Sequence, residues 1–130
     1  MKYSRFEDLP VWKAAVEFAL KVFEFTNKAD FRGLGDTKGQ LERAALSISN
    51  NIAEGFERGR RAEFHQFLSI AKASCAEVRT QIYLACDVEH IDGQTRDTLL
   101  RHAEEVARII GGLRAAVSRT QHSVLSTQHS

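Results

Sequence analysis

Apolar residues at helical spacing run without interruption through the middle of this chain. They alternate in steps of four and three residues and read Phe64, Leu68, Ala71, Cys75, Val78, Ile82 and Ala85. Such steps place the side chains on one face of a helix, and they are typical of a coiled-coil-like seam. A helix with this stripe needs partners that cover it. The spacing therefore predicts a helical bundle.

Three other segments show the same periodicity, and a glycine, a proline or an aspartate stands near each boundary. We expect helices over about residues 9–26, 36–58, 61–90 and 93–118. Short connections between four helices predict an all-α fold, an antiparallel up-down-up-down four-helix bundle. This bundle forms one domain over residues 1–118. The polar, aperiodic tail at residues 119–130 is predicted to be disordered.

The first of these helices is apolar around more of its circumference than one core face requires. Beside its main stripe lies a second stripe, at Val11, Phe18, Val22 and Phe25. A helix with two stripes is either central in its bundle or partly covered by another subunit. We therefore take the second stripe as a candidate contact between copies of the chain.

A polar row accompanies the apolar stripe in the segment before the turn at Gly59. It contains Arg43, Ser47, Asn51, Glu54 and Arg58. We expect Asn51 and Glu54 to hydrogen-bond to backbone ends around that turn. Three interpretations of the row stay open. It is a solvated helix face, a structural network that fixes helix register and subunit contacts, or a ligand site.

The same row predicts side-chain pairs between two helices. An antiparallel hairpin places Ser47 beside Ser74, and Arg43 beside Glu77. We expect the second pair to form an ion pair across the two helices. A buried polar group without a partner costs about 1–3 kcal/mol, so each buried member of this seam needs one.

The net charge of +1 is lower than that of strong nucleic-acid binders, but a local patch is available. Arg58, Arg60 and Arg61 stand at the predicted turn, and Lys38 and Arg43 lie further along. Weaker candidates are Lys72, Arg79, Arg108, Arg114 and Arg119. Contacts from such residues to phosphates give sequence-independent, salt-sensitive affinity. For any single arginine the alternative is a solvated charge or a structural ion pair.

No pattern in the sequence indicates catalysis or a metal site. Ferritin-like bundles use Glu-x-x-His pairs, whereas here His102 precedes Glu105 in the reversed order and His65 and His90 are isolated. We find no glycine-rich phosphate loop, nucleophile elbow or Cys/His cluster. We expect a protein that is not an enzyme and holds no cofactor or metal. Without a signal peptide or a long apolar run, it is expected to be cytoplasmic and to have no membrane partner.

Three phrases of the sequence resemble a known family. They are FEDLPVWKAA at 6–15, SISNNIAEGFERG at 47–59 and EFHQFLSIAKAS at 63–74. Over about residues 6–117 the chain resembles the four-helix-bundle proteins of 23S ribosomal RNA intervening sequences. The resemblance implies a left-handed bundle and a ring-shaped homopentamer. It also implies kinship with the accessory protein of diversity-generating retroelements, which binds a reverse transcriptase and nucleic acid.

The residues that match the family's signature are Asn51, Glu54, Gly55, Arg58, Glu63, Phe64 and Ser74. The chain departs from it at Arg60, where a serine-type helix cap is more usual, so Glu63 loses its capping-box partner. The near-neutral charge also departs from the strongly basic retroelement proteins. We therefore weigh two functions. One is a homo-oligomeric bundle that binds RNA or DNA, and the other is a protein-interaction scaffold or accessory subunit, for example of a reverse transcriptase, without nucleic-acid binding of its own.

Overall fold

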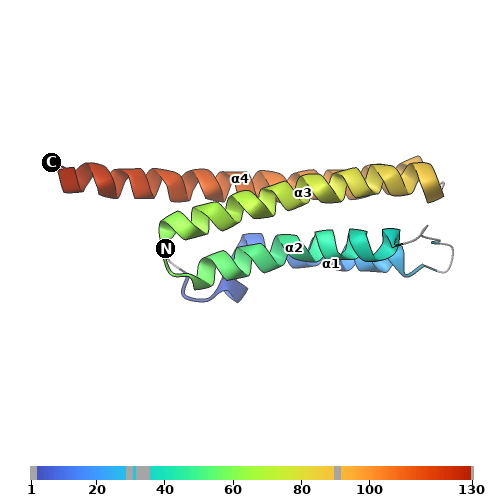
Figure 1. The fold of residues 1–130 in the computed structure, drawn as a ribbon, viewed down its shortest axis with the longest axis horizontal. Helices are drawn as coiled ribbons and strands as arrows, with labels where there is room; N and C mark the ends of the chain where they lie inside the picture. Colours follow the sequence, from blue (N-terminus) through green and yellow to red (C-terminus); the bar gives the residue numbers. More distant parts are fainter. Residues whose placement is uncertain (1–2, 29–30, 32–35, 90–91, 130) are drawn as a thin grey trace.

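The computed structural model describes residues 3–28, 31, 36–89 and 92–129, with side chains for residues 3–28, 31, 36–87 and 92–119. A short 3-10 helix, η1 (Phe6–Asp8), precedes four α-helices. These are α1 (Pro10–Thr26), α2 (Thr37–Glu57), α3 (Arg61–Glu89) and α4 (Gly93–His129). The described residues form helices and no strand, so the predicted all-α four-helix bundle is confirmed (Figure 1).

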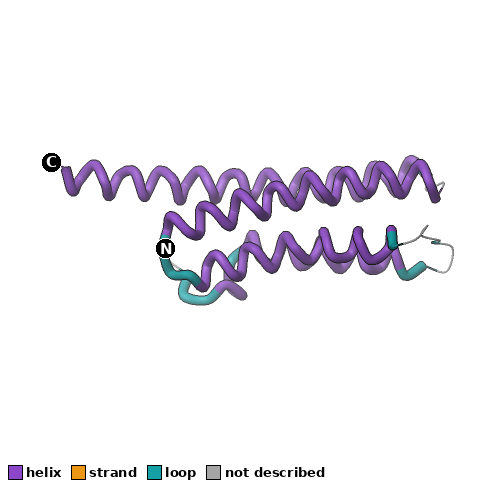
Figure 2. The backbone as a smooth tube through the Cα atoms, viewed as in Figure 1, coloured by secondary structure: helices purple, strands orange, loops and turns teal. Residues whose placement is uncertain are grey.

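Each helix packs against two others. The contacts join α1 to α2, α2 to α3, α3 to α4, and α4 back to α1. Along the α2–α3 contact, Gln40 meets Gln81 and Ser47 meets Ser74, so later residues of α2 meet earlier residues of α3. These two helices therefore run in opposite directions. Figure 2 shows the short connection between them.

The helix boundaries have local causes. Pro10 occupies the first turn of α1, where its missing N–H would be unpaired in any case. Gly59 adopts a φ of +74°, which favours glycine, and so makes the turn between α2 and α3. Asp92 caps α4, because its carboxylate accepts hydrogen bonds from the Thr95 N–H at 2.8 Å and the Thr95 hydroxyl at 2.9 Å. These hydrogen bonds lower the pKa of Asp92 below its ordinary value.

The second apolar stripe of α1 belongs to the core of the protomer. All of its members are buried within one chain: Val11, Phe18, Val22 and Phe25. The prediction that these residues contact another copy is therefore wrong. Because α1 packs against both α2 and α4, it needs two apolar stripes rather than one. The apolar side chain that α1 leaves in solvent is instead Leu20, which is 64% exposed.

The structure describes α4 beyond residue 118, the predicted end of the bundle. The helix continues past Ser118 to His129, and in Figure 1 it extends beyond the other helices at this end of the bundle. The sequence from Leu113 to His129 contains no proline and no glycine, so nothing in it stops a helix that has already begun. That residues 119–130 are disordered stays a prediction.

Close packing between α2 and α3 depends on Gly55. A Cβ on this residue would lie 2.4 Å from the Cβ of Phe67, a distance that carbon atoms do not adopt. Phe56 of α2 meets Phe64 of α3 edge-on beside it, with ring centroids 5.8 Å apart. The glycine therefore lets the two backbones approach near the turn. Its position near the end of a helix predicts a packing or a capping role, and the structure shows packing.

Candidate nucleic-acid interface

The inner half of the polar row lies in the α2–α3 contact. The hydroxyl oxygens of Ser47 and Ser74 are 2.9 Å apart, so the predicted neighbourhood of these residues is confirmed. The Asn51 amide donates to the backbone oxygen of Ser47 at 2.7 Å and to its hydroxyl at 3.0 Å. Ser74 is only 4% exposed and also donates to the backbone oxygen of Ile70. These small side chains satisfy one another and fix the register of the two helices.

The outer half of the row points to solvent and pairs locally. Arg43 forms its ion pair with Asp36, two turns back along α2, and not with Glu77, so the predicted interhelical pair is wrong. Gly39 leaves room for this pair, because a Cβ there would collide with both side chains. Asp36 stands just before the first residue of α2 and is close to Arg43 in sequence. Arg43 can therefore reach Asp36 without extending its side chain across to α3. An ion pair this exposed contributes little stability.

The residues nearest the turn also bond within their own segment. Glu54 accepts from Arg58 at 2.9 Å, and the Arg58 guanidinium lies 5.2 Å from the centroid of the Phe67 ring. The prediction that Glu54 and Asn51 bond to backbone ends around the turn is therefore wrong. Helical spacing of four residues brings Glu54 and Arg58 together without any contribution from α3.

The cations proposed for nucleic-acid binding do not form one patch. Lys38 stands at the start of α2, where it pairs with Glu42, whereas Arg58, Arg60 and Arg61 stand at the other end. At 1.5 Å per residue, the length of α2 separates Lys38 from Arg58 by about 30 Å. Lys38 therefore belongs to a different surface from the three arginines.

The structure brings together other cations, on α3 and α4. Lys72 reaches across to α4, where its Nζ lies 3.6 Å from the position that a Cβ on Gly111 would take. From the opposite side, Arg114 donates to the hydroxyl of Ser69 at 3.3 Å. Two positive side chains from different helices therefore bridge the same contact.

Acidic residues are missing around this contact. The sequence has no aspartate or glutamate at residues 64–76 of α3 or 106–119 of α4. Glu63 lies on the opposite side of α3 from Lys72, because nine residues make two and a half helical turns. Arg108 pairs with Glu105 at the edge of the region. We call the cations of this half of α3 and α4 the basic face: Arg61, Lys72, Arg108, Arg114 and Arg119.

The other half of the α3–α4 contact has mixed charge. Arg79 of α3 pairs with Glu104 of α4 at 3.5 Å. Two exposed acids, Asp87 of α3 and Asp97 of α4, belong to the same half of these helices. Charge is therefore segregated along one pair of helices. After Glu105 the sequence contains arginines and no acid, but only the packing of α3 against α4 adds Lys72 to the arginines of α4.

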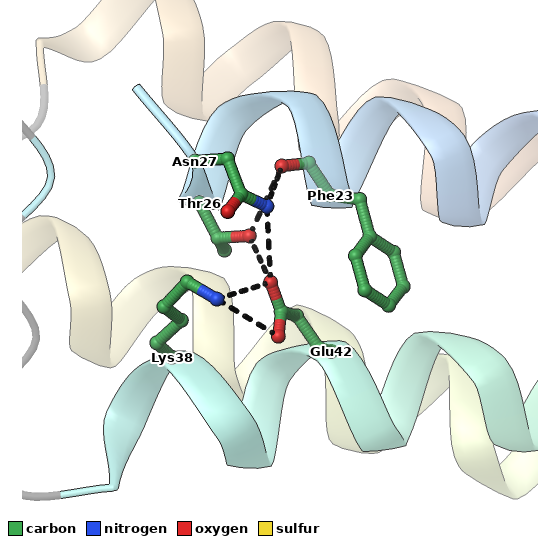
Figure 3. A network of polar contacts seen from close by, with 5 residues as sticks. All are labelled: Phe23, Thr26, Asn27, Lys38 and Glu42. Carbon is green, nitrogen blue, oxygen red and sulfur yellow. Dashed lines mark hydrogen bonds and ion pairs between the residues drawn. The ribbon is translucent and has the colours of Figure 1, made fainter. Parts of the chain in front are cut away.

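A polar network between α1 and α2 was not predicted (Figure 3). Glu42 is 13% exposed, and its carboxylate accepts hydrogen bonds from the Thr26 hydroxyl at 2.5 Å and from Lys38 at 3.2 Å. Asn27 approaches the same carboxylate at 3.4 Å. Burial acts to raise the pKa of Glu42, but these hydrogen bonds and the charge of Lys38 outweigh it and lower the pKa. The four-residue spacing of Lys38 and Glu42 was the available signal, and it gave no hint of Thr26.

The part of the chain that the structure describes has neither a metal-binding cluster nor a membrane-spanning helix. No cluster of three or more histidine, cysteine or acidic side chains there could hold a metal ion. None of the described helices combines the length and apolar character of a membrane span. Neither Cys75 nor Cys86 forms a disulfide among the described residues, and burial raises the pKa of Cys75 to about 11.

Comparison with known proteins supports the fold and the family. A crystal structure of a protein from Bacteroides thetaiotaomicron, described as an S23 ribosomal protein family member with unknown function, has the same fold. The TM-score is 0.70 at 21% identity, over 80% of this chain and 97% of that one. A comparison with curated proteins gives no match. Residues 7–112 match the family described as 23S rRNA-intervening sequence protein. The chain therefore belongs to the 23S rRNA-intervening sequence protein family.

Proposed function

We propose that this protein is a non-enzymatic helical bundle that binds nucleic acid through its basic face. The observation that carries the proposal is that Lys72 reaches toward α4 and Arg114 toward α3 across the same contact, along stretches of both helices that contain no acids. The family description names 23S rRNA, which makes RNA the first nucleic acid to test. A protein with a net charge of +1 binds phosphate best where its cations are gathered and its acids are elsewhere.

The geometry favours backbone contacts over recognition of base sequence. Arg108 and Arg119 lie eleven residues apart and so share a face of α4, about 16 Å from each other. This spacing can reach several phosphates along one strand. Contacts of this kind do not read base sequence and weaken as salt rises.

Fluorescence anisotropy with labelled RNA at low salt tests the proposal. We expect micromolar binding by the wild type and at least tenfold weaker binding by the double variant Lys72→Gln, Arg119→Gln. The matched control removes the same charge from α1 through Lys13→Gln and Lys21→Gln, both of which are exposed residues. No RNA or DNA binding by the wild type at micromolar protein, or an equal loss in the control variant, would contradict the proposal.

A second candidate function is self-assembly into a scaffold. Leu20 of α1 is 64% exposed and Leu46 of α2 is 39% exposed. Large apolar side chains left in solvent are available for contacts between copies of the chain. A homo-oligomer, a pentamer as the family resemblance implies, would use them.

Light scattering after size exclusion tests self-assembly. We expect the wild type to have a mass several times the 14.6 kDa of one chain. Leu20→Lys should have a lower mass, closer to 14.6 kDa. Leu84→Lys is the matched control, because Leu84 is also exposed but lies on α3. A wild-type protein of 14.6 kDa at working concentration would overturn this candidate.

A further inference from the structure

A pocket of about 530 Å³ lies at the turn between α2 and α3. This size falls within the range of about 300–1,000 Å³ that accommodates small organic ligands. The pocket is lined by Tyr3, Ser4, Phe56, Glu57, Gly59, Arg60, Arg61 and Phe64. It therefore combines aromatic rings with two guanidinium groups in one small space.

The rings of the pocket are held in place by the fold. Phe64 is buried in the core, and its ring meets that of Phe56 edge-on. The positive φ of Gly59 turns the chain sharply, so that Arg60 and Arg61 follow immediately beside these rings. Both arginines are exposed, and neither takes part in the ion pairs found among the described side chains. Two cations face one carboxylate, that of Glu57.

We propose that this pocket holds an unpaired nucleotide at the end of a nucleic-acid strand. Aromatic side chains stack on bases of any sequence, and arginine pairs with phosphate. A base inside a duplex is already stacked and paired, so only an unpaired nucleotide can enter. Arg61 belongs to both the pocket and the basic face, and eleven residues place it on the same face of α3 as Lys72. A strand on the basic face can therefore end in the pocket.

This inference rests on the proposed binding of nucleic acid, and the experiment separates the two. The probes are one labelled RNA hairpin with a blunt end and the same hairpin with a short single-stranded overhang. We expect the wild type to bind the overhang form about tenfold more tightly, which corresponds to one stacked base. Arg60→Ala should bring the overhang form down to the affinity of the blunt form and leave the blunt form unchanged.

The controls assign each outcome to one claim. Arg101→Ala removes an exposed arginine of α4 outside the pocket and should keep the overhang preference. Equal affinity of the wild type for both hairpins would overturn the pocket and leave the basic face intact. Binding of neither hairpin would overturn the proposed function itself. Free AMP is the last probe. If AMP binds more tightly than the gain in affinity from the overhang accounts for, the ligand is a free nucleotide and the strand-end proposal is overturned.

Discussion

The two sides of α3 differ in how they use polar residues. Toward α2, the serines at 47 and 74 bond to each other, and Gly55 lets the backbones meet. Toward α4, Lys72 and Arg114 bridge the contact with no acid beside them. The polar groups on the α2 side bond to one another and fix the helix register. The α4 side keeps positive charge available in solvent, which packing alone does not require.

The α2–α3 side is expected to be the more sensitive to added volume. Gly55→Ala places a methyl group where Phe67 already lies, and overpacking of this kind costs about 1–3 kcal/mol. We expect a loss near the upper end of that range in the free energy of unfolding, measured by urea denaturation.

The matched control for this substitution is Gly112→Ala on α4. Nothing lies within 4 Å of the position of the added Cβ, so the higher helix propensity of alanine should stabilise the protein by up to about 1 kcal/mol. Equal effects at the two glycines would remove the distinction between a packed and an open side.

A second prediction concerns the α1–α2 network. Thr26 is 2% exposed, and Thr26→Val removes its hydrogen bond to the Glu42 carboxylate. We expect a loss of about 1.5 kcal/mol at neutral pH, since hydrogen bonds to charged groups are the stronger ones. Thr98→Val, at an exposed threonine of α4, should have little effect.

The pH dependence of that loss follows from the pKa of Glu42. Its folded pKa lies below the ordinary 4.5, so the network's contribution is full well above pH 4.5 and declines as pH falls through the folded pKa. The stability difference between wild type and Thr26→Val should therefore shrink in acid. A difference that stays constant from pH 7 to pH 3, in urea titrations at each pH, would count against a charged Glu42 as the acceptor.

The smallest effect is expected for the serine pair. Ser74→Ala removes one hydroxyl, but Ser47 keeps its hydrogen bond from Asn51. We expect a loss of about 0.5–1 kcal/mol by urea denaturation. Thr80→Ala is a suitable control, because the Thr80 hydroxyl bonds to a backbone oxygen in the same way but is exposed. A loss in Ser74→Ala no larger than in the control would show that the pair does not fix the register.

Periodicity predicted the fold because it records burial directly. The unbroken stripe from Phe64 to Ala85 is the core face of α3, whereas Gly55 indicated a packing or a capping role without saying which. The stripe at Phe18 and Val22 was misread because a second apolar face can meet either another helix or another subunit. Sequence alone does not say which of the two covers the face. Each helix of a four-helix bundle has two neighbouring helices, which favours another helix of the same chain.

The polar contacts were harder to predict than the fold. Arg43 had acids available at Asp36 and at Glu77, and the nearer one along the helix formed the pair. The sequence offered Lys72 and the arginines after Glu105 only as separate weaker candidates, because these residues are far apart in the chain and only the packing of α3 against α4 brings their segments together. Exposed ion pairs contribute little free energy, so a long charged side chain has several partners of similar energy. Burial of an apolar stripe contributes much more, so it fixes which face of a helix lies in the core.

The salt dependence of RNA affinity tests the role of the basic face most directly. We expect the logarithm of the wild-type association constant to fall linearly with the logarithm of salt concentration. The Lys72→Gln, Arg119→Gln variant should have a slope shallower by about two, one for each lost phosphate contact. The Lys13→Gln, Lys21→Gln control should keep the wild-type slope. The same slope in wild type and basic-face variant, with a shallower slope in the control, would place the nucleic acid on another surface.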